Sequence, residues 1–148
     1  MISGKINKNV VTQRSAWVKQ MLDSLHDLPI HKKEEFFFNR HNVAAAESYL
    51  RRALEALFDL GRHILVKRFI YPATEYKEIA IGLFEKRILV EKDAELMRQM
   101  AGYRNRMVHF YQEISPEELL DICSHHLDEI EMILNRLIDW VKNDQKWK

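Results

Sequence analysis

Glycine and proline are scarce in this chain, and their scarcity limits how many turns it can form. Its 148 residues include four glycines and three prolines, the residues that most often interrupt regular structure. A chain with so few of them is expected to fold into few, long elements, which means helices. The length suits one domain with a single substantial core. We therefore predict an all-α fold in which residues 1–148 form one domain.

Apolar residues recur at three- and four-residue steps, the spacing of an amphipathic helix, in five segments. The first predicted helix covers roughly residues 7–26, and the second covers about residues 33–69, shortly before Pro72. The apolar stripe of the first helix, which we assign to the core, consists of Val10, Trp17, Val18, Met21 and Leu25.

The remaining helices have clearer boundaries. Thr74 is the predicted N-cap of a short third helix over residues 75–85, and residues 88–90 are expected to form a connection. A fourth helix begins near residue 91 or 92. Ser115, Pro116 and Glu118 together predict the start of a fifth helix that continues to Trp140. The polar tail, residues 142–148, is expected to fray. The expected architecture is an up-and-down bundle of four main helices plus one short helix.

Charge and composition narrow the function classes. The formal net charge is +1, so any contact with RNA should use a local patch, because non-specific nucleic-acid binding needs a strong basic excess. No stretch approaches the roughly 18 apolar residues of a membrane span, and the N-terminus lacks the apolar region of a secretory signal. The single Cys123 excludes an internal disulfide framework and a cysteine-based zinc site. We expect a cytoplasmic protein.

The segment Arg104-Asn105-Arg106-Met107-Val108-His109-Phe110-Tyr111 is polar inside an otherwise apolar helical pattern. Its residue types suit phosphodiester cleavage. Histidine can exchange a proton near neutral pH, and arginine can stabilise the charge that develops on phosphorus. Tyr111 can donate a hydrogen bond to phosphate, Asn105 can orient the imidazole or a bound strand, and Arg106 adds a further cation. Arg104 and His109 are the candidate catalytic pair.

Helical geometry complicates a site made from one straight helix. Residues five apart, such as Arg104 and His109, lie about 140° apart around the axis, whereas Arg104 and Tyr111 are offset by only about 20°. Two alternatives remain open. Either the helix unwinds before His109, or a second protomer contributes its own copy of the motif across a two-fold axis. The second alternative predicts an obligate homodimer.

The motif RNRMVHFY resembles the R-x4-6-H-x-Y signature of the HEPN superfamily. Within that superfamily the chain is similar to the HepT type, the toxin half of the HepT/MntA toxin–antitoxin systems. The layout agrees as well, in the long second helix with Tyr49, Leu50 and Ala53, in the Pro72…Thr74-x-Tyr76 helix entry and in the capped final helix. The resemblance covers nearly the whole chain.

The resemblance implies a homodimer whose paired motifs line a cleft at the interface. It implies a metal-independent endoribonuclease toxin of a type II/VII-like pair that acts on mRNA or tRNA, needs no cofactor, and binds neither DNA nor membrane. Arg104 and His109 would be catalytic. Tyr111 would receive AMP from a minimal nucleotidyltransferase antitoxin, and the added bulk and negative charge would oppose RNA binding. The alternative is a non-catalytic helical dimer that binds a nucleotidyltransferase and presents a substrate to it.

Two other groups of residues have simpler interpretations. His125 and His126, with Asp121 and Glu129 four residues away at either side, are interpreted as a solvated face with intrahelical pairs, and no metal site is predicted. The second helix has a basic edge. Its cations are expected to pair with neighbouring carboxylates, and the alternative is that they contact an RNA backbone. The residues of this edge are Arg51, Arg52, Arg62, His63, Lys67 and Arg68, and the carboxylates are Glu47, Glu55 and Asp59.

Overall fold

The computed structural model describes residues 4–109 and 113–144, and within these ranges it contains seven helices and no strand. The fold is therefore all-helical, as predicted. Four helices are long: α1 (Lys8–His26), α3 (Arg40–Phe69), α5 (Glu91–Val108) and α7 (Leu127–Asn143). Three are short: α2 (Lys33–Phe38), α4 (Tyr76–Glu85) and α6 (Pro116–His125).

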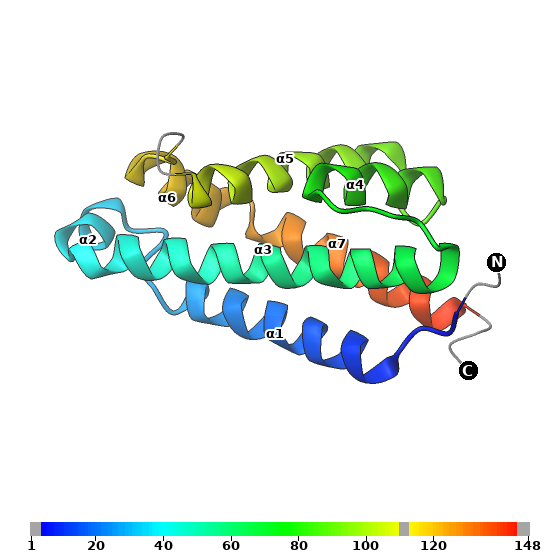
Figure 1. Cartoon of the computed structure of the whole chain (residues 1–148). Helices are drawn as coiled ribbons and strands as arrows, with labels where there is room; N and C mark the ends of the chain where they lie inside the picture. The colour runs from blue at the N-terminus through cyan, green and yellow to red at the C-terminus, as the bar shows by residue number, and fades with distance from the viewer. Residues whose placement is uncertain (1–3, 110–112, 145–148) are drawn as a thin grey trace.

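The long helices alternate in direction, which confirms the up-and-down arrangement (Figure 1). Helix α3 runs through the middle, with α1 along one side and α4 and α5 along the other, and α7 packs against both α1 and α3. Helices α2 and α6 lie at one end of the bundle, and the start of α1 and the end of α7 lie at the opposite end.

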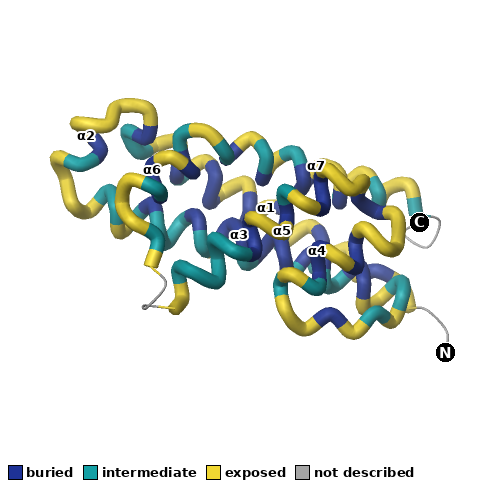
Figure 2. The backbone as a smooth tube through the Cα atoms, turned by 90° about the horizontal axis from the view of Figure 1, so that it is seen from above, coloured by how far each residue is buried: buried dark blue, intermediate teal, exposed yellow. Residues whose placement is uncertain are grey.

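Helix α3 is the core element because it is apolar on most of its sides. Leu50, Leu54, Leu57, Phe58 and Leu60 are completely buried, and Figure 2 shows buried residues concentrated where helices face one another. At Gly61 an added Cβ would lie 3.0 Å from a side-chain carbon of α4, so a glycine allows the two helices to approach closely. A helix that is apolar on most sides must be covered by neighbours.

The predicted second helix, residues 33–69, is interrupted at Asn39. This residue has an extended backbone, with φ −109° and ψ 109°, and its side chain accepts a hydrogen bond of 2.9 Å from the His41 N–H. Asn42 donates from its side chain to the Phe36 carbonyl at 3.2 Å. Asparagine side chains compete with helical backbone hydrogen bonds. The side chains of Asn39 and Asn42 bond backbone groups at the interruption, and α2 is therefore separate from α3.

The predicted fifth helix is also divided, at His126. Ser124 Oγ lies 2.6 Å from the carbonyl of Leu120 and 2.7 Å from that of Ile30, and can donate its proton to either. A hydroxyl that bonds the carbonyl four residues earlier bends a helix. The result is an α6–α7 break that the apolar periodicity of residues 115–140 did not reveal.

Three smaller expectations are corrected. Thr74 is not an N-cap: Glu75 occupies that position without a side-chain cap, and the Thr74 carbonyl instead accepts from Arg62 at 3.2 Å. The buried stripe of α1 is Val11, Ser15, Val18, Met21, Leu22 and Leu25. Trp17, predicted as core, is 39% exposed, since it lies at the edge of that stripe.

Helix α7 extends two residues into the tail that was expected to fray, and residues 145–148 lie outside the described residues. The helix continues through Lys142 and Asn143, and the Asp144 carboxylate lies 2.6 Å from Arg68 Nε at the end of α3. This ion pair connects the last turn of α7 to the central helix. None of the described helices is long and apolar enough to cross a membrane.

The start of α6 at Ser115 is confirmed. Ser115 Oγ accepts a hydrogen bond of 3.1 Å from the Glu118 N–H, and Pro116 is the first helical residue. This cap fixes the residue at which α6 begins.

We expect Ser115→Ala to lower the free energy of unfolding by about 1 kcal/mol, because the first turn of α6 loses a partner for a backbone N–H. Urea unfolding followed by circular dichroism would measure the change. Ser115→Asp keeps a cap acceptor and should stay close to the wild type. Equal stability of the alanine variant and the wild type would show that the cap contributes nothing.

Candidate functional site

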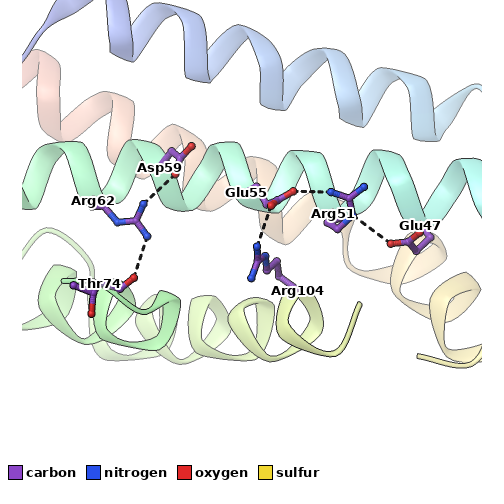
Figure 3. A network of polar contacts seen from close by, with 7 residues as sticks. All are labelled: Glu47, Arg51, Glu55, Asp59, Arg62, Thr74 and Arg104. Carbon is purple, nitrogen blue, oxygen red and sulfur yellow. Dashed lines mark hydrogen bonds and ion pairs between the residues drawn. The ribbon is translucent and has the colours of Figure 1, made fainter. Parts of the chain in front are cut away.

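A line of charged residues runs along the one open side of α3. Between residues 51 and 62 the helix has five side chains that are not buried, and every one of them is charged. We call these residues the polar strip: Arg51, Arg52, Glu55, Asp59 and Arg62. Arg51 lies 2.9 Å from Glu55, and Arg62 lies 3.3 Å from Asp59. Four of these five charges are therefore paired with one another on a stretch of α3 whose other residues are buried (Figure 3).

Arg104 reaches this strip from α5. Its Nη2 donates to Glu55 Oε2 at 3.1 Å, and Figure 3 shows the carboxylate of Glu55 between Arg104 and Arg51. The guanidinium also lies over the ring of Tyr76, with Cζ 4.5 Å from the ring centroid. The same ring stacks on Phe58, with centroids 4.8 Å apart and an interplanar angle of 9°, and Arg62 Cζ lies 5.8 Å from its centroid.

These contacts hold the guanidinium from two directions. A charge-assisted hydrogen bond and a cation–π contact each restrict where the side chain can point. The Arg104 side chain is 24% exposed, and its Nε is buried with no hydrogen-bond partner among the described residues. Arg104 is thus fixed by α3 and α4 and retains donors that the fold does not use.

Tyr76 is suited to a supporting role and not to proton transfer. Burial raises the pKa of its phenol above the ordinary value, and nearby Glu55 and Asp59 raise it further, against the opposing effect of Arg104 and Arg62. The phenol therefore stays neutral at physiological pH. A neutral, flat ring on a buried Phe58 is a rigid surface for the Arg104 guanidinium.

Helix α5 ends at Val108, the residue immediately before His109. His109 has an extended backbone with φ −104° and ψ 100°, and its N–H donates to the Asn105 carbonyl at 3.2 Å. The backbone thus corresponds to the first of the two alternatives, in which the helix stops before His109. His109 is exposed. Because it lies beyond the last helical residue, the offset of about 140° from Arg104 expected on a continuous helix does not apply to it. Tyr111 lies outside the described residues.

Arg106 is bound within the fold. Its two terminal nitrogens each donate to one oxygen of Glu118 at 2.7 Å, which is the bidentate geometry of a strong arginine–carboxylate pair. Glu118 was predicted as part of a capping box at the start of α6, but its side chain joins α6 to α5. The pair therefore connects the last turns of α5 to the first turn of α6, and two donors of Arg106 are already used.

The adjacent histidines of the last predicted helix pair separately with their own neighbours. His125 Nδ1 lies 3.1 Å from a carboxylate oxygen of Asp121, and His126 Nδ1 lies 3.1 Å from Glu129. The two rings thus serve different carboxylates. Within the described ranges no group of three or more histidine, cysteine, aspartate or glutamate residues could hold a metal ion.

Part of this site was not predicted from sequence. The ion pair between Arg104 and Glu55 joins positions 49 residues apart, and the stacking of Tyr76 was not anticipated. The available signal was the four-residue spacing of Glu47, Arg51, Glu55 and Asp59, which places these charges on one side of a helix. Pairing of Arg51 with Glu47 and Glu55, and of Arg62 with Asp59, follows the expectation for the basic edge.

Sequence comparison finds similarity to one family over most of the chain. Residues 18–137 match the model of the family described as ribonuclease HepT-like. The mRNA nuclease HepT of Shewanella oneidensis is 24% identical over 86 residues, which are 58% of this chain and 65%, just under two thirds, of that protein. The tRNA nuclease HepT of Aphanizomenon flos-aquae is 23% identical over 86% of this chain and 87% of its own length.

Solved structures share the fold at low sequence identity. One is a tri-AMPylated HEPN toxin of Shewanella oneidensis in complex with the MNT antitoxin, with a TM-score of 0.81 and 18% identity over 90% of this chain and 99% of that chain. Another is the cytosolic protein YutE of Bacillus subtilis, of unknown function, with a TM-score of 0.79 and 14% identity over 97% of this chain and 96% of that chain. At these identities the likeness concerns the fold.

The Arg106–Glu118 pair predicts a pH-dependent contribution to stability. The hydrogen bond from Arg106 lowers the pKa of the Glu118 carboxyl below its usual 4.5. Because the pKa is lower in the folded state, the contribution is complete above about pH 4.5 and is lost as the pH falls through the folded value. We expect Glu118→Gln to reduce the free energy of unfolding at pH 7 by roughly 1 kcal/mol or less, since the pair is partly exposed.

The same variant should differ less from the wild type at pH 3. Urea unfolding at both pH values measures the change. Glu117→Gln removes a charge from the same first turn of α6 and is the matched control for the helix dipole. A Glu118→Gln deficit that is equally large at pH 3 would contradict the assignment.

Proposed function

Because this chain belongs to the HepT-like family, whose model matches residues 18–137, we propose that it is an endoribonuclease that cleaves mRNA or tRNA without a metal ion. The observation that supports this proposal most directly is the arrangement of α5. Arg104 is fixed on the last turns of the helix by Glu55 and Tyr76, and the helix ends directly before His109.

The proposed reaction is transesterification within the RNA strand. The ribose 2′-oxygen attacks the neighbouring phosphorus and loses its proton to a base, and the bond from phosphorus to the 5′-oxygen breaks as that oxygen gains a proton. The products are a 2′,3′-cyclic phosphate and a free 5′-hydroxyl. His109 is assigned the proton transfers, the task for which enzymes use histidine most often. Arg104 stabilises the extra negative charge on the phosphorane.

One imidazole cannot remove one proton and donate another in the same step. A homodimer that brings two copies of the motif together would supply His109 twice, once as the base and once as the acid. The proposal therefore includes a two-fold symmetric dimer with one composite site. Asn105 and Arg106 are assigned supporting contacts to the strand, although two Arg106 donors are bound to Glu118.

Regulation by a nucleotidyltransferase is the second part of the proposal. The solved structures of similar fold include an AMPylated HEPN toxin with its MNT antitoxin and a toxin–antitoxin pair with AMP-PNP. We infer that Tyr111 of this chain accepts AMP from such a partner. The phenolic oxygen would bond to the α-phosphorus of ATP, and pyrophosphate would leave. The added negative charge next to the motif would repel RNA phosphates.

The nuclease assignment predicts that the purified protein cleaves RNA in EDTA and leaves 2′,3′-cyclic phosphate ends. Arg104→Ala and His109→Ala should each reduce the rate at least about 100-fold, because each removes a group acting in the transition state. Gel analysis of labelled RNA with end-group mapping measures both effects. Arg98→Ala changes an exposed arginine of the same helix, paired with Glu95, and should cleave normally. Unchanged cleavage by His109→Ala would refute the mechanism.

The modification assignment predicts that an MntA-type nucleotidyltransferase and ATP add the mass of AMP to the wild type and abolish cleavage. Tyr111→Phe removes the accepting oxygen and should gain no mass at that position, whereas Tyr103→Phe should be modified as the wild type is. Intact-mass spectrometry followed by peptide mapping locates the adduct. Added mass on a wild-type protein that never cuts RNA would favour the non-catalytic helical dimer.

A further inference from the structure

A hollow of about 250 Å³ lies between α1 and α3 and shares Glu55 with the Arg104 contact. It is lined by Arg14 and Trp17 of α1 and by Arg52, Glu55, Ala56 and Asp59 of α3. Glu55 therefore has two roles, since the carboxylate that lines the hollow also binds Arg104. A molecule that reaches the Arg104 guanidinium can extend into the hollow without leaving the polar strip.

The charges around the hollow leave cations available. Arg52 is exposed and pairs with no carboxylate in the part of the chain that the structure describes. Arg14 Nε lies 3.7 Å from Asp59, beyond hydrogen-bond distance, and has no hydrogen-bond partner among the described residues.

The polar strip and the residues that pair with it contain more guanidiniums than carboxylates. Glu47, Glu55 and Asp59 are the carboxylates that pair with the arginines here, and they face five guanidiniums. These guanidiniums belong to Arg14, Arg51, Arg52, Arg62 and Arg104. A chain with a formal net charge of +1 thus concentrates positive charge where an RNA backbone would pass.

Trp17 supplies a surface for a base. Its side chain lines the hollow, and 39% of the residue is exposed, although its neighbour Val18 is completely buried. An indole face beside arginines is the combination on which unpaired bases stack in single-stranded RNA recognition. The hollow is below the roughly 300 Å³ of the smallest usual ligand pockets, so it is suited to one base and not to a whole nucleotide cofactor.

We propose that this hollow is a subsite for one unpaired base of the RNA, next to the phosphate held by Arg104. The base stacks on Trp17, and Arg52 contacts the backbone phosphate of that nucleotide. This inference rests on the proposed function, because the position of the RNA strand is inferred from a phosphate bound to Arg104. It restricts the substrate to RNA that is single-stranded beside the cleavage point, since a base in a duplex is already stacked and paired.

Binding to uncut RNA tests the subsite. The probe is a fluorescein-labelled single-stranded RNA 12-mer of mixed sequence, and every protein carries His109→Ala so that the probe stays intact. Adding Trp17→Ala should weaken binding about 5- to 150-fold, the range for loss of one base–aromatic stack. Trp17→Phe keeps an aromatic face and should recover most of the affinity. Arg52→Gln should lower the slope of log affinity against log salt by about one.

Two matched substitutions control for general surface effects. Phe84→Ala removes another exposed aromatic side chain, 45% exposed on α4, and Arg98→Gln removes an arginine that lies six residues before Arg104 on α5 and pairs with Glu95. Both should bind the probe like the His109→Ala parent. A fully paired duplex of the same sequence should bind equally to the parent and to its Trp17→Ala derivative.

The outcomes separate this inference from the proposed function. Equal affinity of the parent and its Trp17→Ala derivative for the single strand would overturn the subsite, even if cleavage requires Arg104 and His109. Conversely, Trp17-dependent binding by a wild-type protein that cuts no RNA would support the subsite and overturn the nuclease assignment.

Discussion

The central position of α3 determines where charge can be placed in this bundle. Other helices cover most of its circumference, so between residues 51 and 62 only one line of side chains is not buried, and all of them are charged. Each part of the candidate site is attached to this line. Arg104 comes from α5, the loop carbonyl of Thr74 precedes α4, and Arg14 comes from α1. The open side of one apolar helix thus organises polar groups from three neighbours.

The contacts of Arg104 hold its guanidinium in one position and leave it able to attract an anion. A guanidinium packed between helices is costly unless a carboxylate accompanies it. Glu55 provides that charge but divides it between Arg51 and Arg104, and the Tyr76 ring contributes orientation without a full counter-charge. An arginine held in this way can still attract an anion, whereas a closed bidentate pair such as Arg106–Glu118 satisfies the cation more completely.

Periodicity and capping residues were sufficient to predict the all-helical bundle and the start of α6 at Ser115, because both depend on local sequence. The breaks at Asn39 and His126 were missed because side-chain bonds to the backbone overrode an uninterrupted apolar pattern. Trp17 was misassigned because a tryptophan beside Val18 resembles core, and exposure depends on the direction from which α3 packs. The Glu55–Arg104 contact is tertiary, and no local pattern reveals it.

The end of α5 at Val108 also bears on how the motif can vary. Inside a helix, each residue added between the arginine and the histidine would rotate the histidine by about 100° and carry it to another side. Beyond the helix, an added residue lengthens an extended segment by about 3.3 Å and can be absorbed by bending. A histidine placed just past the helix end therefore tolerates insertions. The four-to-six-residue spacing of the signature that this chain resembles is the variation that such a placement allows.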